Sequence, residues 1–87
     1  MRIKILGTGC ARCKQLEKTT TEVVRELGVD ATVEEVKDMM KIMEYPILTT
    51  PGLVINEEVV CAGRVPSKAE LARLIADALT KEGRANA

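Results

Sequence analysis

The chain has 87 residues, which is enough for one domain with a modest hydrophobic core. Its 13 basic residues balance its 13 acidic residues, and it has one Tyr and no Phe or Trp, so it lacks the excess positive charge and the stacking side chains of a nucleic-acid-binding protein. No segment has the length and hydropathy of a membrane span or a signal peptide, so we expect a cytoplasmic protein.

The first predicted strand, Ile3–Leu6, stops at the turn-forming sequence Gly7-Thr8-Gly9. From Cys10 onward the apolar residues recur every three or four positions, which predicts a helix that starts at or just after Cys10. Gly28 is suited to end this helix, because glycine adopts the left-handed conformation at low cost. The face of the helix that we expect to be buried includes Cys13, Leu16, Thr20, Val23, Val24 and Leu27.

A second strand is predicted over Val29–Val36, where β-branched residues alternate with polar ones. Asp38 can cap a short helix that reaches Met43, and Pro46 ends it. We expect three methionines of this segment to fill the aromatic-poor core rather than to bind a metal through their thioethers. They are Met39, Met40 and Met43.

The second half of the chain predicts a hairpin and a final helix. Two apolar runs, Gly52–Ile55 and Glu58–Cys61, flank Asn56-Glu57, although Asn-Glu is a weaker turn signal than Asn-Gly. Ser67 to Glu70 has the form of a capping box, in which the first and fourth side chains bond to the backbone of the first turn. The apolar positions between residues 71 and 79 then have helical spacing.

The predicted order of elements is βαβαββα. A strand–helix–strand unit favours parallel pairing, and a hairpin adds antiparallel strands. We therefore expect an α/β fold with a mixed four-stranded sheet and helices on both faces. We expect residues 1–80 to form a single domain, and residues 81–87 to form a frayed tail.

The chain has three cysteines and no histidine. A secreted disulfide scaffold would usually have more cysteines, in an even number. Three Cys without His cannot complete the usual zinc tetrahedron or ligate an iron–sulfur cluster on their own. We therefore expect no resident metal and no other cofactor.

The motif Cys10-Ala11-Arg12-Cys13 lies where the first strand leads into a helix. Free backbone N–H groups and the helix dipole stabilise an anion at such a helix N-terminus, and Arg12 and Lys14 add positive charge. These effects lower the pKa of a cysteine, and the thiolate is the reactive form. Cys13 lies one turn later on the face expected to be buried. Cys10 is therefore the candidate nucleophile, and Cys13 the candidate resolving thiol.

This motif and the segment Tyr45–Ile55, which reads Tyr-Pro-Ile-Leu-Thr-Thr-Pro-Gly-Leu-Val-Ile, resemble the thioredoxin/glutaredoxin superfamily. The resemblance covers residues 1–80 and is closest to the small thioredoxin-like redox-active disulfide proteins of bacteria and archaea. It implies a monomeric thiol–disulfide oxidoreductase that serves electron transport and cell redox homeostasis. The implied partners are disulfide-containing client proteins and an electron donor of the thioredoxin-reductase type.

The resemblance also assigns residues beyond the two cysteines. Pro51 falls on the family's cis-proline, and Thr50 before it should offer its backbone to an extended client segment. Gly63 falls on the glycine that flanks the substrate groove. The family's usual Trp-Cys-Gly-Pro-Cys is here Gly-Cys-Ala-Arg-Cys, so the Trp and the Pro are missing.

Thioredoxins carry a buried Asp six residues before the first active-site Cys, which assists proton transfer at the second Cys. Counting back from Cys10 places Lys4 there, and the residue matched to the family's Lys partner is Glu34. The resemblance thus implies an acid–base pair with exchanged charges, in which Glu34 accepts a proton from Cys13. The alternatives are that a one-residue shift selects Glu35, and that both side chains simply reach solvent.

Two other functions compete with this interpretation. The segment Ile3–Cys13 also resembles the start of heavy-metal-associated domains, whose two thiolates suit copper(I), but that family has the order βαββαβ and ends on a strand. A binding module without turnover is the third alternative. Cys61 is expected near Cys10 but beyond bridging distance, either as a small apolar filler or as a third thiolate for a soft ion.

Overall fold

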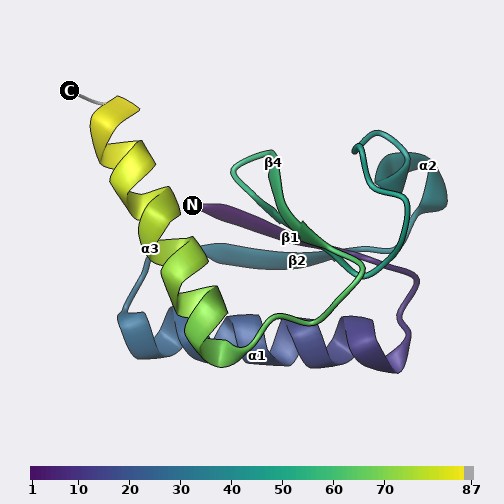
Figure 1. The fold of residues 1–87 in the computed structure, drawn as a ribbon, viewed down its shortest axis with the longest axis horizontal. Helices are drawn as coiled ribbons and strands as arrows, with labels where there is room; N and C mark the ends of the chain where they lie inside the picture. Colours follow the sequence, from purple (N-terminus) through teal and green to yellow (C-terminus); the bar gives the residue numbers. More distant parts are fainter. Residues whose placement is uncertain (86–87) are drawn as a thin grey trace.

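The computed structural model describes residues 1–85 and confirms the predicted βαβαββα order (Figure 1). Each strand has four or five residues, whereas α1 and α3 are long helices and α2 is a single turn. The elements are β1 (Arg2–Leu6), α1 (Ala11–Leu27), β2 (Thr32–Val36), α2 (Met39–Ile42), β3 (Gly52–Ile55), β4 (Glu58–Ala62) and α3 (Lys68–Ala85).

The four strands form one mixed sheet in the order β2-β1-β3-β4. Strand β1 pairs parallel with β2, because α1 crosses between them, and antiparallel with β3, which continues into β4 through a hairpin. In this register Leu6, the last residue of β1, pairs with Gly52, the first residue of β3. The loop that leaves β1 therefore lies beside the loop that enters β3, and these two loops carry the redox motif and Pro51.

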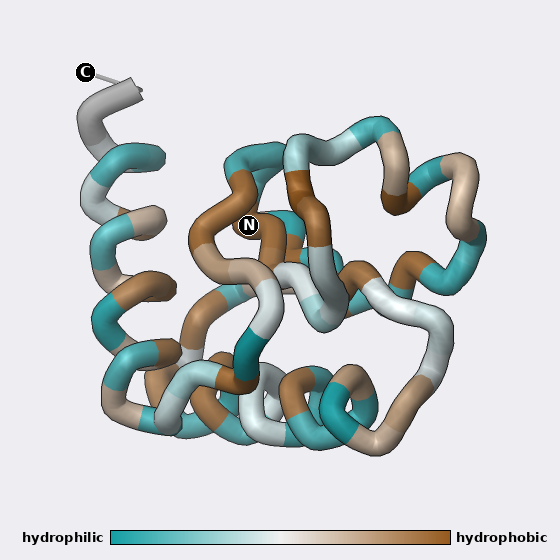
Figure 2. The backbone as a smooth tube through the Cα atoms, turned by 45° about the vertical axis from the view of Figure 1, so that its right-hand side comes forward, coloured by the Kyte–Doolittle hydropathy of each residue, from teal (hydrophilic) through white to brown (hydrophobic). Residues whose placement is uncertain are grey.

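One face of the sheet carries the main core, under α1 and α3, which pack against each other (Figure 1). Alternate side chains of the strands point to this face, as the two-residue period of a strand requires. Figure 2 shows the apolar positions of the strands gathered in the middle of the molecule. The fully or nearly buried members of this cluster are Ile3, Ile5, Leu16, Val23, Leu53, Ile55, Cys61, Leu71 and Ile75.

The opposite face is covered by α2 and by the loop that follows it, so helices lie on both faces as predicted. Among the described side chains, the buried core on this face consists of Leu6, Ile42 and Val54. The expectation that the methionines of this segment fill the core is wrong. A four-residue helix presents only one side chain, Ile42, to the sheet, and its methionines are exposed.

Several element boundaries differ from the prediction for local reasons. Strand β2 begins at Thr32 rather than at Val29, because the Val29 N–H still donates to Val24 of α1 and the chain is turning away from the helix. Gly28 ends α1 in the left-handed conformation, as predicted. The hairpin turn also forms as predicted, with both Asn56 and Glu57 at positive φ.

Helix α3 begins with half of the predicted capping box. The Ser67 hydroxyl accepts from the Glu70 N–H at 3.1 Å, but the Glu70 carboxylate pairs with Arg64. The helix continues through residues 81–85, which were expected to fray, and residues 86 and 87 lie outside the described part of the chain. Glu82 accepts a hydrogen bond from Asn56 at 2.6 Å, which ties this last part of α3 to the hairpin turn. Within residues 1–85, none of the helices could cross a membrane.

Candidate active site

Cys10 is the N-cap residue of α1, so the structure places it at the helix N-terminus as the sequence predicts. The loop after β1 reaches this position through Gly9, whose φ of +89° favours glycine. The Cys10 carbonyl accepts the first helical hydrogen bond from Lys14 at 3.0 Å, and the Cys10 side chain caps no backbone group. Its sulfur therefore lies where the N–H groups of the first helical turn converge.

The two sulfurs of the motif lie 3.0 Å apart, and both cysteines are in the thiol form. Cys10 is exposed and Cys13 is buried. Gly7 makes room for the buried thiol, because a side chain at Gly7 would overlap the Cys13 sulfur. One thiol thus faces solvent and the other lies directly beneath it.

The environments of the two thiols move their pKa values in opposite directions. A hydrogen bond from the Cys13 thiol, together with backbone N–H groups of the first helical turn, lowers the pKa of Cys10 below its ordinary value. Burial, followed by the hydrogen bond to Cys10, raises the pKa of Cys13. Cys10 is the thiol that ionises first, and Cys13 holds its proton longer.

The Arg12 side chain does not do what the sequence analysis expected of it. Its guanidinium donates to the Gly63 carbonyl at 3.0 Å, and its charge is not among the causes of the lowered pKa of Cys10. Hydrogen bonds, rather than the charges of Arg12 and Lys14, are therefore the main causes of the lowered pKa of Cys10. Arg12 instead links the redox motif to the loop after β4.

A second loop closes the site from the side of β3. The Thr50–Pro51 peptide bond is cis, and the Pro51 carbonyl accepts from the Gly63 N–H at 2.8 Å. Gly63 has positive φ, and a side chain there would collide with the Thr49 hydroxyl, so only glycine lets the two loops approach this closely. Thr50 is exposed and lies beside Gly7, which covers Cys13. The structure thus brings Thr50, Pro51 and Gly63 together around the cysteine pair.

Comparison with known proteins agrees with this geometry. A model of the thioredoxin domain family matches residues 1–76, which is most of the chain. The chain belongs to the thioredoxin family. It is 45% identical over 75 residues to a thioredoxin of Methanothermobacter thermautotrophicus, a match that covers 86% of this chain and 97% of that one. It is 38% identical over 69 residues to a thioredoxin of Methanocaldococcus jannaschii, covering 79% of each chain.

The fold comparison points the same way. The structure matches the germline-specific thioredoxin Deadhead of Drosophila melanogaster with a TM-score of 0.61, 16% identity, and coverage of 87% of this chain and 78% of that one. This likeness concerns the fold. Together with the family and its cysteine pair, it makes the protein a thiol–disulfide oxidoreductase of the thioredoxin type. The order βαβαββα of the described elements differs from the βαββαβ order of the heavy-metal-associated fold.

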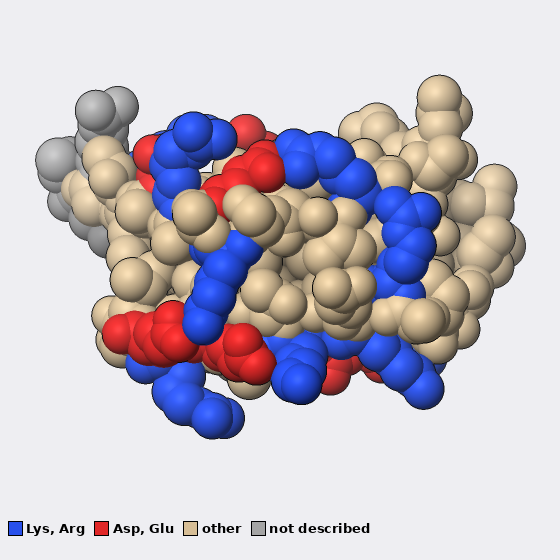
Figure 3. All heavy atoms as spheres, turned by 60° about the horizontal axis from the view of Figure 1, so that its bottom comes forward, with Lys and Arg blue, Asp and Glu red and all other residues tan. Residues whose placement is uncertain are grey.

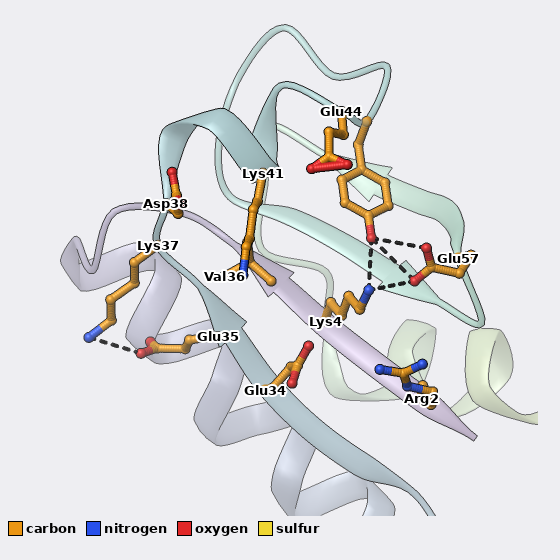
Figure 4. A pocket seen from close by; sticks show the side chains of 11 residues that line it. Arg2, Lys4, Glu34, Glu35, Val36, Lys37, Asp38, Lys41, Glu44 and Glu57 are labelled. Atoms are coloured by element: carbon orange, nitrogen blue, oxygen red, sulfur yellow. Dashed lines mark hydrogen bonds and ion pairs between the residues drawn. The ribbon is translucent and has the colours of Figure 1, made fainter.

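The expected ion pair between Lys4 and Glu34 is not formed. The two residues are neighbours in the parallel register of β1 and β2, and both side chains line the same polar pocket (Figure 4). The Lys4 ammonium, however, donates to Glu57 at 2.6 Å and to the Tyr45 hydroxyl at 3.0 Å. These bonds raise the pKa of Lys4 to about 12.

The position of Lys4 also separates it from the redox motif. Lys4 alternates with Ile3 and Ile5 along β1, so it faces α2 while they face α1. The sheet thus stands between the Lys4 side chain and Cys13. The role of Glu57 could not be predicted from the sequence, because this residue reaches Lys4 only through the hairpin turn.

An acidic pair that the sequence analysis did not assign lies on the α1 side. Glu17, four residues after Cys13 on α1, shares a hydrogen bond with Glu35 of β2, which raises the pKa of Glu17 and lowers that of Glu35. Lys37 lies 3.2 Å from the Glu35 carboxylate and neutralises it. The sequence does contain a signal for Glu17: it lies four residues after Cys13, a spacing that places the two side chains on one face of the helix.

Cys61 is a member of the main core cluster. It is buried, and its thiol contacts the Arg64 carbonyl at 3.9 Å. Within the described part of the chain, no three His, Cys, Asp or Glu side chains are placed to hold a metal ion. Burial among aliphatic side chains favours the filler role over that of a third thiolate.

Proposed function

We propose that Cys10 attacks a disulfide of a client protein and that Cys13 resolves the product, so that this protein works as a cytoplasmic, monomeric disulfide reductase. The Cys10 thiolate attacks one client sulfur, a mixed disulfide forms, and the other client sulfur leaves as a thiolate that takes up a proton. Cys13 then loses its proton and attacks the Cys10 sulfur. The second client thiol leaves, the Cys10–Cys13 disulfide remains, and two electrons have passed to the client.

The observation that carries this assignment is the contrast between the two thiols. Cys10 is exposed and its pKa is lowered, whereas Cys13 is buried and its pKa is raised, with 3.0 Å between the sulfurs. An incoming disulfide reaches only Cys10. The short separation places Cys13 close to the sulfur that it must attack.

The loops around the pair supply the client-binding surface in this proposal. Thr50 offers the backbone beside the cis bond to Pro51, and Gly63 lines the other side without a side chain to obstruct an extended segment. A flavin-dependent reductase of the thioredoxin-reductase type is the proposed electron donor, because each client turnover leaves the enzyme oxidised.

Reaction with iodoacetamide across a range of pH tests the order of the two thiols. We expect Cys10 to be alkylated first, with a half-maximal rate at a pH below that of an unperturbed thiol, and Cys13 to react only at higher pH. Mass spectrometry of digested peptides identifies the modified residue. Faster alkylation of Cys13 than of Cys10 would reverse the assignment.

Insulin reduction by cysteine variants tests the catalytic cycle. We expect Cys10→Ser to reduce the rate to background, and Cys13→Ser to accumulate a covalent mixed disulfide with the client, visible on a non-reducing gel. Cys61→Ser is the matched control, because Cys61 lies in the core, and it should retain turnover. Turnover by Cys10→Ser at the wild-type rate would refute the mechanism.

A further inference from the structure

A polar cavity of about 460 Å³ lies between the sheet and α2 (Figure 4). Strands β1 and β2 supply its floor, and α2, the residues after it and the hairpin turn supply its walls. Its lining includes neither cysteine of the redox motif, nor Thr50, Pro51 or Gly63. The cavity is therefore a place where a ligand could bind without occupying the site of thiol–disulfide exchange.

Part of the charge in this cavity is already neutralised by the protein itself. Lys4 donates to Glu57 at 2.6 Å, and only 16% of the Lys4 side chain is exposed, so this pair is held in place. Lys37 lies 3.2 Å from the Glu35 carboxylate. The Asp38 carboxylate accepts a backbone hydrogen bond at the start of α2. These five lining residues have their partners within the chain.

The other four charged side chains of the lining have no such partner. They are Arg2, Glu34, Lys41 and Glu44, and none of them forms an ion pair with a side chain that the structure describes. Figure 4 shows Arg2, Glu34 and Lys41 pointing toward the space between β1, β2 and α2. On the α1 side of the molecule, by contrast, several acidic side chains lie against basic ones (Figure 3). The cavity thus presents two free cations and two free carboxylates to one space.

We propose that this cavity binds a small zwitterion, a molecule with one ammonium and one carboxylate group, such as an amino acid or a dipeptide. Glu34 would repel a ligand that is only anionic, and Arg2 and Lys41 would repel one that is only cationic. A zwitterion satisfies both sets, with its ammonium group against Glu34 and its carboxylate against Arg2 or Lys41. The volume of the cavity is sufficient for a ligand of this size.

Titration of the ¹⁵N-labelled protein with L-serine and with seryl-serine tests the site by NMR. We expect amide signals of β1, β2 and α2 to shift and to saturate in the millimolar range for at least one of the two probes. N-acetylation of that probe removes its positive charge and amidation removes its negative charge. Each change should weaken binding about fivefold, as the loss of one exposed charge contact allows. Absence of saturable shifts, or equal binding of the capped forms, would overturn the proposal.

Two variants assign the two charges of the ligand. Glu34→Gln should remove most of the effect of N-acetylation and retain that of amidation, whereas Lys41→Gln should do the reverse. Lys18→Gln and Asp77→Asn are the matched controls, because they change the net charge equally at exposed positions outside the lining. All four positions are exposed, so the variants should fold, which urea denaturation verifies. Equal weakening by the control variants would show a nonspecific charge effect and would overturn the proposal.

Two further measurements separate this site from its alternatives. Sodium phosphate has no ammonium group, and phosphate binding as tight as that of the zwitterion would replace the proposal with a plain anion site. Cys10→Ser should bind the probe as the wild type does, because Cys10 does not line the cavity. Loss of binding in Cys10→Ser would place the probe at the redox motif and overturn the proposal. Insulin reduction by Glu34→Gln and Lys41→Gln should equal that of the wild type, and a rate that falls in parallel with zwitterion binding would contradict a site separate from the redox motif.

Discussion

The two faces of the sheet differ in depth of packing. Among the residues that the structure describes, nine buried side chains form a continuous, largely aliphatic cluster under α1 and α3, whereas three form the cluster under α2. The deeply packed face carries the helix that positions Cys10 and Cys13. The lightly packed face carries the exposed methionines and leads to the loop before Pro51. The redox cysteines are thus carried by the deeply packed side of the sheet, whereas the loop before Pro51 leaves the lightly packed side.

The polar side-chain pairs on the two faces of the sheet also differ, in the charges that they bring together. On the α1 side, Glu17 and Glu35 are two acids that share a hydrogen bond, with Lys37 as the neutralising cation. On the α2 side, Lys4 and Glu57 are opposite charges that attract each other directly. Acidification should therefore act on the α1 side through two opposed contributions, a gain from the raised pKa of Glu17 and a loss from the lowered pKa of Glu35, whereas the α2 side only loses stability through the lowered pKa of Glu57.

The largest expected effect comes from truncating the two cores. Leu16→Ala removes a fully buried side chain from the nine-residue cluster, where neighbours cannot collapse into the cavity, and we expect a loss near the upper end of about 2–5 kcal/mol in the free energy of unfolding. Ile42→Ala should cost near the lower end of that range, because the thin α2 layer can relax. Urea denaturation measures both, and equal losses would contradict the expected difference between the two faces.

Gly7 offers a second test of the deeply packed side. Gly7→Ala places a methyl group against the Cys13 sulfur, and we expect a loss of about 1–3 kcal/mol in the free energy of unfolding together with slower insulin reduction. Gly83→Ala is the matched control, because nothing lies within 4 Å of the added methyl group in α3. It should stabilise the helix by less than about 1 kcal/mol. An unchanged free energy of unfolding in Gly7→Ala would show that the backbone around Gly7 and Cys13 shifts to accommodate the methyl group, which would contradict the prediction.

The acidic pair tests the electrostatics of the α1 side with a smaller effect. The pKa of Glu17 is raised in the folded state, so its proton is bound more tightly after folding and stability increases as the pH falls through that raised value. Glu17→Gln should stabilise the protein at neutral pH and remove this gain on acidification. Glu35→Gln is the comparison variant. It removes the ion pair with Lys37 as well as the like-charge repulsion, so it should not stabilise the protein. Urea titrations between neutral pH and pH 4 compare the two, and destabilisation by Glu17→Gln at neutral pH would contradict the prediction.

The smallest effect belongs to the pair on the α2 side. The pKa of Glu57 is lowered, so its contribution is present above the pKa of an unfolded carboxyl group and is lost as the pH falls through the lowered value. The pKa of Lys4 is raised to about 12, so its contribution is complete below 10.5 and is lost as the pH rises through about 12. Glu57→Gln should weaken the acid dependence of thermal unfolding only slightly, because this carboxylate is well exposed. A large decrease in the melting temperature of Glu57→Gln would contradict this prediction, because it would mean that the Lys4–Glu57 pair contributes strongly to the stability of the α2 side.

Local patterns predicted the fold and the centre of the site. The four-residue cysteine motif after a short strand, Gly28 at the end of a helix and Thr50-Pro51 before an apolar run each depend on a few neighbouring residues, and the structure confirms their placement. What could not be predicted depends on contacts across the chain. Lys4 finds its partner Glu57 only because the hairpin returns to β1. Helical spacing suggested a buried face for the methionines, but spacing does not reveal that a one-turn helix covers so little of the sheet.

The hydrogen bonds between the hairpin turn and the last helix also determine where a tether or a second domain could be joined to the protein. Asn56 bonds to both Arg2 and Glu82, so the start of β1 and the last turns of α3 meet at the end of the sheet opposite Leu6 and the redox loops (Figure 1). Strand β1 has five residues, so its two ends lie about 13 Å apart. A surface tether or a fused domain joined through either end of residues 1–85 should therefore leave Cys10 facing solution.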